Sequence, residues 1–76
     1  MGLSPDDEVV VRDSVARAIE GKADLAALIK IHEEGLRRAR QNARTATANL
    51  AGEERTIAMR QLALDLLTAG LEGRTS

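Results

Sequence analysis

Apolar residues recur with a helical period along most of this 76-residue chain. In the most regular stretch, apolar positions are spaced alternately four and three residues apart, which is the a/d pattern of a coiled-coil seam. The seam consists of Leu25, Ile29, His32, Leu36, Ala39, Ala43, Ala46 and Leu50. The pattern predicts one long helix over residues 24–50, roughly 40 Å in length. Its second half is rich in alanine, which favours a closely packed neighbouring helix.

An earlier segment predicts a helix over residues 5–20. Ser4 can cap its start, Pro5 suits the first helical position, and Gly21 is the natural stop. Its apolar face consists of Val11, Val15, Ala18 and Ile19. Because only a short link follows before the capping residue Asp24, we expect this helix to fold back antiparallel against the first half of the long helix.

The pattern predicts a third helix over residues 53–70, after a break at Gly52, and a frayed tail over residues 72–76. Its apolar residues divide into two stripes. One stripe is Met59, Leu62, Leu66 and Ala69, and the other is Ile57, Leu64, Leu67 and Leu71. Two stripes imply two packing partners. The long helix can cover one stripe, so we expect a second copy of the chain to cover the other.

These elements indicate a single all-α domain over residues 1–76, in which the long central helix is the spine of a helical homodimer. The chain contains no aromatic residue and no cysteine, so it lacks large buried rings and disulfide staples. Its hydrophobic content of 43% is nonetheless too high for a disordered chain. The expected dimer interface consists of Ala39, Ala43, Ala46, Leu50, Ile57, Leu64, Leu67 and Leu71. The pattern leaves open whether the subunits run parallel or antiparallel.

Charge is unevenly distributed although the net charge is only −1. Residues 35–52 contain four arginines and no acidic residue, whereas the segments on either side are net acidic. The arginines lie mainly opposite the seam, and the candidate partner-binding residues are Arg37, Arg38, Arg40, Gln41 and Arg44. Such residue types contact phosphates and base edges, but they also form i,i+4 ion pairs, here Glu33–Arg37 and Glu34–Arg38. The sequence favours a solvated or intersubunit charge face over a nucleic-acid interface.

Residues suited to catalysis are scarce, and we expect no enzymatic activity, no cofactor and no metal site. His32 lies on the apolar seam without a second ligand on its own face, so we expect a histidine at the core edge satisfied by one hydrogen bond. A pH-dependent role remains an alternative for it. Gly35 beside the seam can admit a close contact, or it can be neutral.

The function expected from these features is a small non-enzymatic, homodimeric interaction module, acting as an adaptor, regulator or inhibitor that occludes a surface of another protein. The alternative is a dimeric nucleic-acid-binding regulator that uses the arginine face. No apolar run approaches the length of a membrane span, and the acidic start is unlike a signal peptide. We therefore expect a soluble cytoplasmic protein with no membrane partner.

Overall fold

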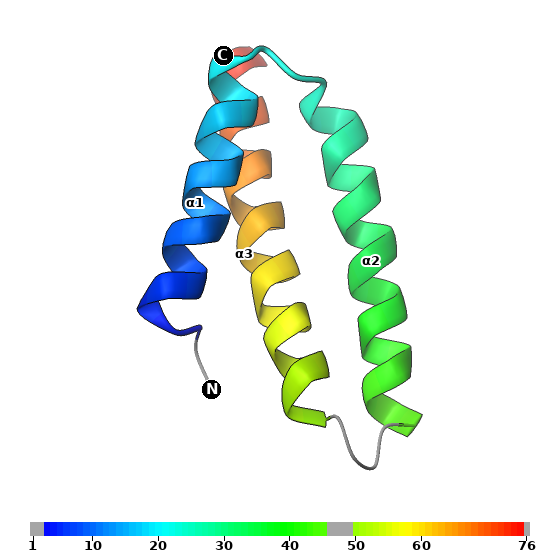
Figure 1. Cartoon of the computed structure of the whole chain (residues 1–76). Helices are drawn as coiled ribbons and strands as arrows, with labels where there is room; N and C mark the ends of the chain where they lie inside the picture. Colours follow the sequence, from blue (N-terminus) through cyan, green and yellow to red (C-terminus); the bar gives the residue numbers. More distant parts are fainter. Residues whose placement is uncertain (1–2, 46–49, 76) are drawn as a thin grey trace.

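The computed structural model describes residues 3–45 and 50–75, and within these ranges the chain forms three α-helices and no strand (Figure 1). They are α1 (Pro5–Glu20), α2 (Leu25–Thr45) and α3 (Leu50–Thr75). The all-helical prediction is confirmed. The predicted bounds of the first helix agree with α1, but those of the other two differ from the structure.

The first two helices begin as their capping residues predict. The Ser4 hydroxyl accepts a hydrogen bond of 3.2 Å from the backbone N–H of Asp7. Asp24 Oδ1 accepts one of 3.2 Å from the N–H of Ala27. Each side chain thus satisfies one of the backbone donors that a helix start leaves without a partner.

The end of α1 is closed by a Schellman motif rather than by a simple glycine stop. The N–H of Ala23 bonds to the carbonyl of Ala18 at 3.0 Å, and the N–H of Lys22 bonds to that of Ile19 at 3.2 Å. The left-handed residue that this motif requires is Lys22, with φ of 56°, whereas Gly21 has an ordinary φ of −76°.

The boundary between the second and third helices lies earlier than predicted. α2 ends at Thr45, and Leu50 belongs to the first turn of α3 rather than to the end of α2. Gly52 therefore lies inside α3 and does not form the break. Ala46, assigned to the seam and to the dimer interface, lies outside the described residues.

The last helix also continues beyond its predicted end. α3 runs through Gly70 to Thr75, so the described part of the predicted frayed tail is helical. A Cβ at Gly70 would lie 3.0 Å from Ile19 Cδ1 and 3.4 Å from Leu25 Cδ1. The glycine thus lets α3 approach the end of α1 and the start of α2 closely, and this packing offsets its low helix propensity.

Arg74, near the end of α3, binds the end of α1. Its Nη1 donates to the carbonyl of Ala23 at 2.7 Å, and its Nη2 donates to that of Ile19 at 3.1 Å. The guanidinium thus adds a second hydrogen bond to the Ile19 carbonyl, which already accepts from Lys22, and provides a donor for the Ala23 carbonyl in the link after α1.

The central helix of the fold is α3, not α2. Both α1 and α2 pack along α3, while they make little contact with each other (Figure 1). The main core cluster consists of Val11, Val15, Leu25, Ala63 and Leu67. The first two helices run antiparallel as predicted, but α1 covers α3 instead of the first half of α2. The molecule is a thin rod of 43 × 24 × 17 Å.

Candidate functional site: the arginine face of α2

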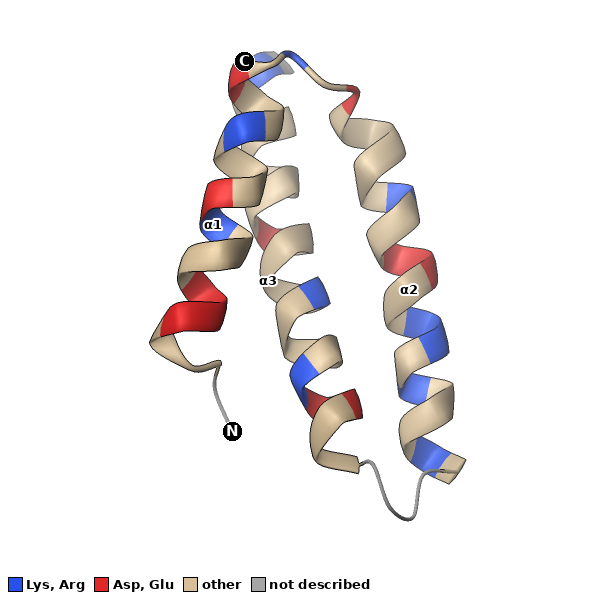
Figure 2. Ribbon diagram, viewed as in Figure 1, with Lys and Arg blue, Asp and Glu red and all other residues tan. Residues whose placement is uncertain are grey.

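The predicted arginine face lies on the outer side of the second half of α2, where basic residues are concentrated (Figure 2). All five predicted residues are exposed. One shallow groove of about 410 Å³ runs along this part of the helix, and it is lined by Glu33, Leu36, Arg37, Arg40, Gln41 and Arg44. The helix therefore brings four of the five predicted residues together on a single surface.

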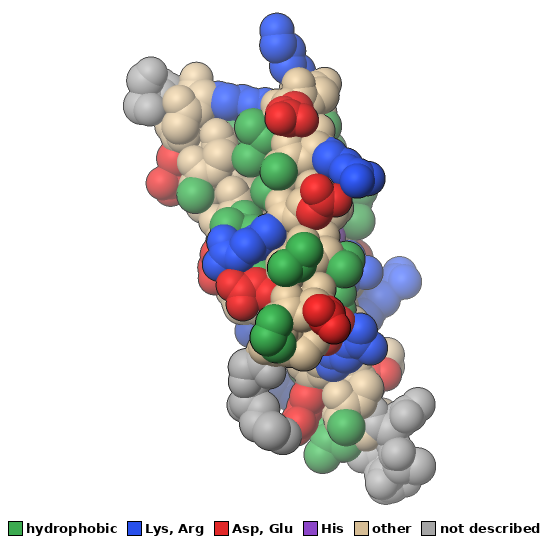
Figure 3. All heavy atoms as spheres, turned by 60° about the vertical axis from the view of Figure 1, so that its left-hand side comes forward, with side chains coloured by type: hydrophobic (Ala, Val, Ile, Leu, Met, Phe, Trp, Pro, Cys, Tyr) green, Lys and Arg blue, Asp and Glu red, His purple; other side chains and the backbone are tan. Residues whose placement is uncertain are grey.

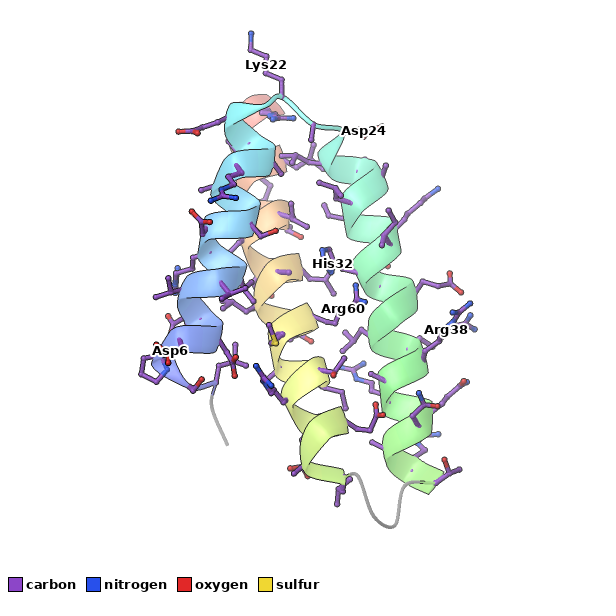
Figure 4. The ribbon with its side chains drawn as sticks, viewed as in Figure 1. Asp6, Lys22, Asp24, His32, Arg38 and Arg60 are labelled. Atoms are coloured by element: carbon purple, nitrogen blue, oxygen red, sulfur yellow. The ribbon has the colours of Figure 1, made fainter. Side chains whose placement is uncertain are left out.

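Arg38 lies on a different side of α2 from this groove. It borders a second hollow, together with Lys30, Ile31 and Arg60. Figure 4 shows the Arg38 side chain extending away from the bundle. The predicted set is therefore split between two hollows, with Arg38 in one and the other four residues in the other.

The ion pairs on this face differ from those predicted. Arg37 Nη2 lies 2.7 Å from Glu34 Oε1, an i,i+3 pair, and neither predicted i,i+4 pair is present among the described residues. Arg40 makes only a long contact of 3.4 Å with Gln61 of α3. Within the described parts of the chain, Arg38 and Arg44 have no acidic partner. Much of the positive charge on the face is therefore uncompensated.

His32 is half-buried between α2 and α3 and lies 3.0 Å from Arg60, measured from Nδ1 to Nη1. Figure 4 shows the two side chains pointing toward one another. A guanidinium is always a donor, so Nδ1 must accept and the ring proton belongs on Nε2. Burial and, to a lesser extent, the positive charge of Arg60 lower the pKa of His32 below its usual value of 6.5. The prediction of a core-edge histidine with one hydrogen bond is confirmed.

Gly35 provides the space that this contact needs. A Cβ at Gly35 would lie 2.7 Å from Arg60 Cζ, so the glycine admits the guanidinium against the surface of α2. Arg60 was not among the predicted site residues. The available signals were a glycine within a helix and an arginine beside the apolar stripes of the next helix, but neither signal identifies the other residue.

A second polar contact links α1 to α3. Arg55 binds both carboxylate oxygens of Asp7, with 2.8 Å between Nε and Oδ2 and a second short bond from Nη2 to Oδ1. The Arg55 hydrogen bond, with a smaller contribution from Ser4, lowers the pKa of Asp7 below its usual value of 3.8, although burial opposes the shift. The sequence indicated only that Asp7 complements the dipole of its own helix.

The residues assigned to a dimer interface occupy unlike environments. Ala39 and Leu67 are 3% and 1% exposed within the single chain, so they pack inside the subunit rather than between subunits. Ala43, Ile57, Leu64 and Leu71 are half-buried, and Leu71 also packs against the main core cluster. Leu50 is 44% exposed. Most of the first stripe of α3, and Leu67 and Leu71 of the second, thus belong to or pack against the core of the same chain.

Over residues 3–45 and 50–75, no cluster of three or more potential metal ligands occurs. No helix in the same ranges is long and apolar enough to cross a bilayer. Comparisons with known protein families, with curated proteins and with solved structures find no match to this chain.

Proposed function

We propose that this protein is a small non-enzymatic interaction module, acting as an adaptor, regulator or inhibitor that covers a surface of another protein. The observation that carries the proposal is the uncompensated charge on α2. Arg37, Arg40 and Arg44 lie along one exposed groove, and Arg44 has no acidic partner in the part of the chain that the structure describes. A rigid helix holds these side chains at fixed spacing before any partner arrives.

The partner surface that best complements this face is an acidic one. Arginine offers a planar fork of donors that matches carboxylates in pairs, and it is enriched at protein interfaces. Leu36 also lines this groove, but it is only 7% exposed. The net negative charge of the whole chain disfavours strong non-specific attraction to nucleic acid.

A nucleic-acid-binding regulator is the second candidate, because the groove places Gln41 beside three arginines on one helix face. These are side chains that contact base edges and phosphates. The salt dependence of binding to duplex nucleic acid tests this second candidate. Binding to a mixed-sequence duplex through several phosphates would weaken steeply as salt rises. Absence of binding at low salt would eliminate this candidate.

Self-association is part of the proposed function. The apolar side chains that favour it are not those that the sequence assigned to the dimer interface. Leu67 is buried within the chain and Ile57, Leu64 and Leu71 are half-buried, so the most exposed large apolar side chains lie on α1 and α2. Val9 and Val10 of α1 are 64% and 59% exposed, and Ile31 of α2 is 59% exposed. We propose a homodimer that covers part of this surface and that works in the cytoplasm.

A charge-reversal experiment tests the arginine face. In one variant the four arginines at positions 37, 38, 40 and 44 become Glu. A matched control carries four reversals elsewhere, at Arg12, Arg17, Lys22 and Lys30, and has the same net charge. In pull-downs from the native host, the first variant should lose partners that the wild type and the control retain. Retention of every partner by a folded first variant would contradict the proposal.

A further inference from the structure

The fold leaves an open groove between α1 and α2, because both helices pack on α3 but hardly on each other. The groove has a volume of about 330 Å³. Its apolar walls include Val10, Val11 and Val15 of α1 and Met59 of α3. In four-helix bundles a fourth helix fills a groove of this kind, so a further helix can pack against α1 and α2 here.

The groove is also lined by a positively charged side chain, Arg60, that has no ion-pair partner among the described residues. Arg60 lines it beside His32, which offers only a neutral nitrogen to the guanidinium. No acidic side chain lines the groove among the described residues, and Arg60 is only partly exposed. A half-buried charge is stabilised when an opposite charge approaches, so the occupant that best complements this groove brings a carboxylate together with an apolar face.

The outward face of α1 has this combination of residues. Asp6, Val9, Val10 and Asp13 follow one another at i, i+3, i+4 and i+7, so two exposed valines lie between two carboxylates. Asp13 pairs with Arg17 at the surface, whereas Asp6 has no ion-pair partner in residues 3–45 and 50–75. Figure 3, turned to bring this side of the molecule forward, shows hydrophobic side chains among acidic ones on the surface.

We propose that α1 of a second copy of this chain lies antiparallel against α1 and covers the groove, with Asp6 of each chain binding Arg60 of the other. We place the two-fold axis of this dimer at Val10. A residue that precedes Val10 by a given number of positions in one chain then faces the residue that follows Val10 by the same number in the other chain. Asp6 then lies opposite Ser14, which lines the same groove as Arg60. The inference rests on the homodimer of the proposed function and specifies its interface.

Two charge-reversal variants test this contact by sedimentation. Asp6→Arg places two cations together in each symmetric contact, and Arg60→Glu places two anions together. Each variant alone should dimerise at least about tenfold more weakly than the wild type. In an equimolar mixture, both contacts of the heterodimer join a cation to an anion. The two introduced side chains meet in one contact, and the native Asp6 and Arg60 meet in the other. The mixture should therefore recover an affinity within about threefold of the wild type.

Recovery in the mixture has no explanation in misfolding, because two misfolded chains would not restore each other. A control pair, Glu20→Arg and Arg38→Glu, reverses charges of the same kinds outside the groove, and each should dimerise like the wild type. If the wild type dimerises but the two test variants do so equally well, this interface is wrong while the homodimer stands. A wild type that stays monomeric at about 100 µM, about a thousandfold above the dissociation constant of a tight dimer, would overturn both the homodimer and this interface. The arginine face would still be tested by its own charge-reversal experiment.

Discussion

The contact between His32 and Arg60 determines which protonation state of the imidazole the fold tolerates. Nδ1 accepts a hydrogen bond from the guanidinium at 3.0 Å, and a protonated ring would instead present a donor to another donor. Burial and the neighbouring positive charge both favour the neutral ring, and they lower the pKa of His32. The sequence predicted that His32 lies at the core edge. The contact with Arg60 adds a pH dependence of stability with a definite direction.

We expect the free energy of unfolding to fall as the pH drops from 7.5 through 6.5. Below 6.5 the unfolded chain binds a proton at His32 more readily than the folded chain does, so protonation favours unfolding. The loss continues down to the lowered pKa of the folded state and then levels off. Chemical denaturation at intervals between pH 5 and 7.5 measures it, and His32→Asn should flatten the profile in this window.

A matched variant separates the effect of Arg60 from that of burial. Gly35→Ala places a methyl group where the guanidinium lies, and the flexible arginine should move away. The pKa of His32, followed by NMR, should rise but remain below 6.5, because burial is the larger cause. Helix propensity should stabilise the variant by up to about 1 kcal/mol. An unchanged His32 pKa would show that Arg60 does not act on the ring.

Local residue patterns were predictable from sequence, and distant contacts were not. Ser4 and Asp24 cap their helices as expected, and Glu8 and Arg12 form an i,i+4 pair at 2.9 Å. Such contacts lie within about one helical turn, where spacing limits the possible partners. Spacing does not choose among them, since Arg37 binds Glu34 and not the expected Glu33. Asp7 and Arg55 are 48 positions apart, so their contact depends on how α1 docks on α3.

Helix ends depended on backbone geometry that the residue types did not reveal. A glycine at position 21 suggested the usual left-handed stop, but the motif extends one residue further and places Lys22 in that conformation. A side chain there is strained, because its Cβ approaches the following carbonyl. Similarly, Gly52 and Gly70 were interpreted as helix boundaries, whereas both lie inside α3.

Relieving this strain should stabilise the protein. Lys22→Gly should raise the free energy of unfolding by about 1 kcal/mol, because glycine adopts the left-handed region without a steric cost. Lys22→Ala is the control, since it removes the same charge but retains a Cβ, and it should produce little gain. Urea denaturation of the two variants compares them directly. Equal effects would mean that charge, and not conformation, accounts for the change.

At the scale of the whole molecule, the sequence predicted three helices but assigned the wrong one to the centre. The seam over residues 24–50 suggested α2 as the spine, and the two stripes of α3 suggested a second subunit. Periodicity shows that a face must be buried, but it does not show which element buries it. In the structure Leu67, which the sequence pattern assigned to a partner chain, is buried in a core that α3 forms with α1 and α2.

Docking of α1 should depend on Asp7 and Arg55 acting as a pair. Asp7→Asn and Arg55→Gln should each lower the melting temperature, and the double variant should lower it no further than the stronger single one. The Asp7 pKa is lowered, so its contribution is present above 3.8 and disappears as the pH falls through the folded-state value. Additive effects of the two substitutions would indicate that the residues act independently.

Because α1 docks on α3, the order in which a ribosome makes this chain differs from the order in which it can fold. The first helix emerges with Val11 and Val15 uncovered, and its partners Ala63 and Leu67 are made about fifty residues later. Arg74, which binds the carbonyls of Ile19 and Ala23, is made later still. The first helix therefore cannot reach its packed position until the α3 residues that cover Val11 and Val15 have been made.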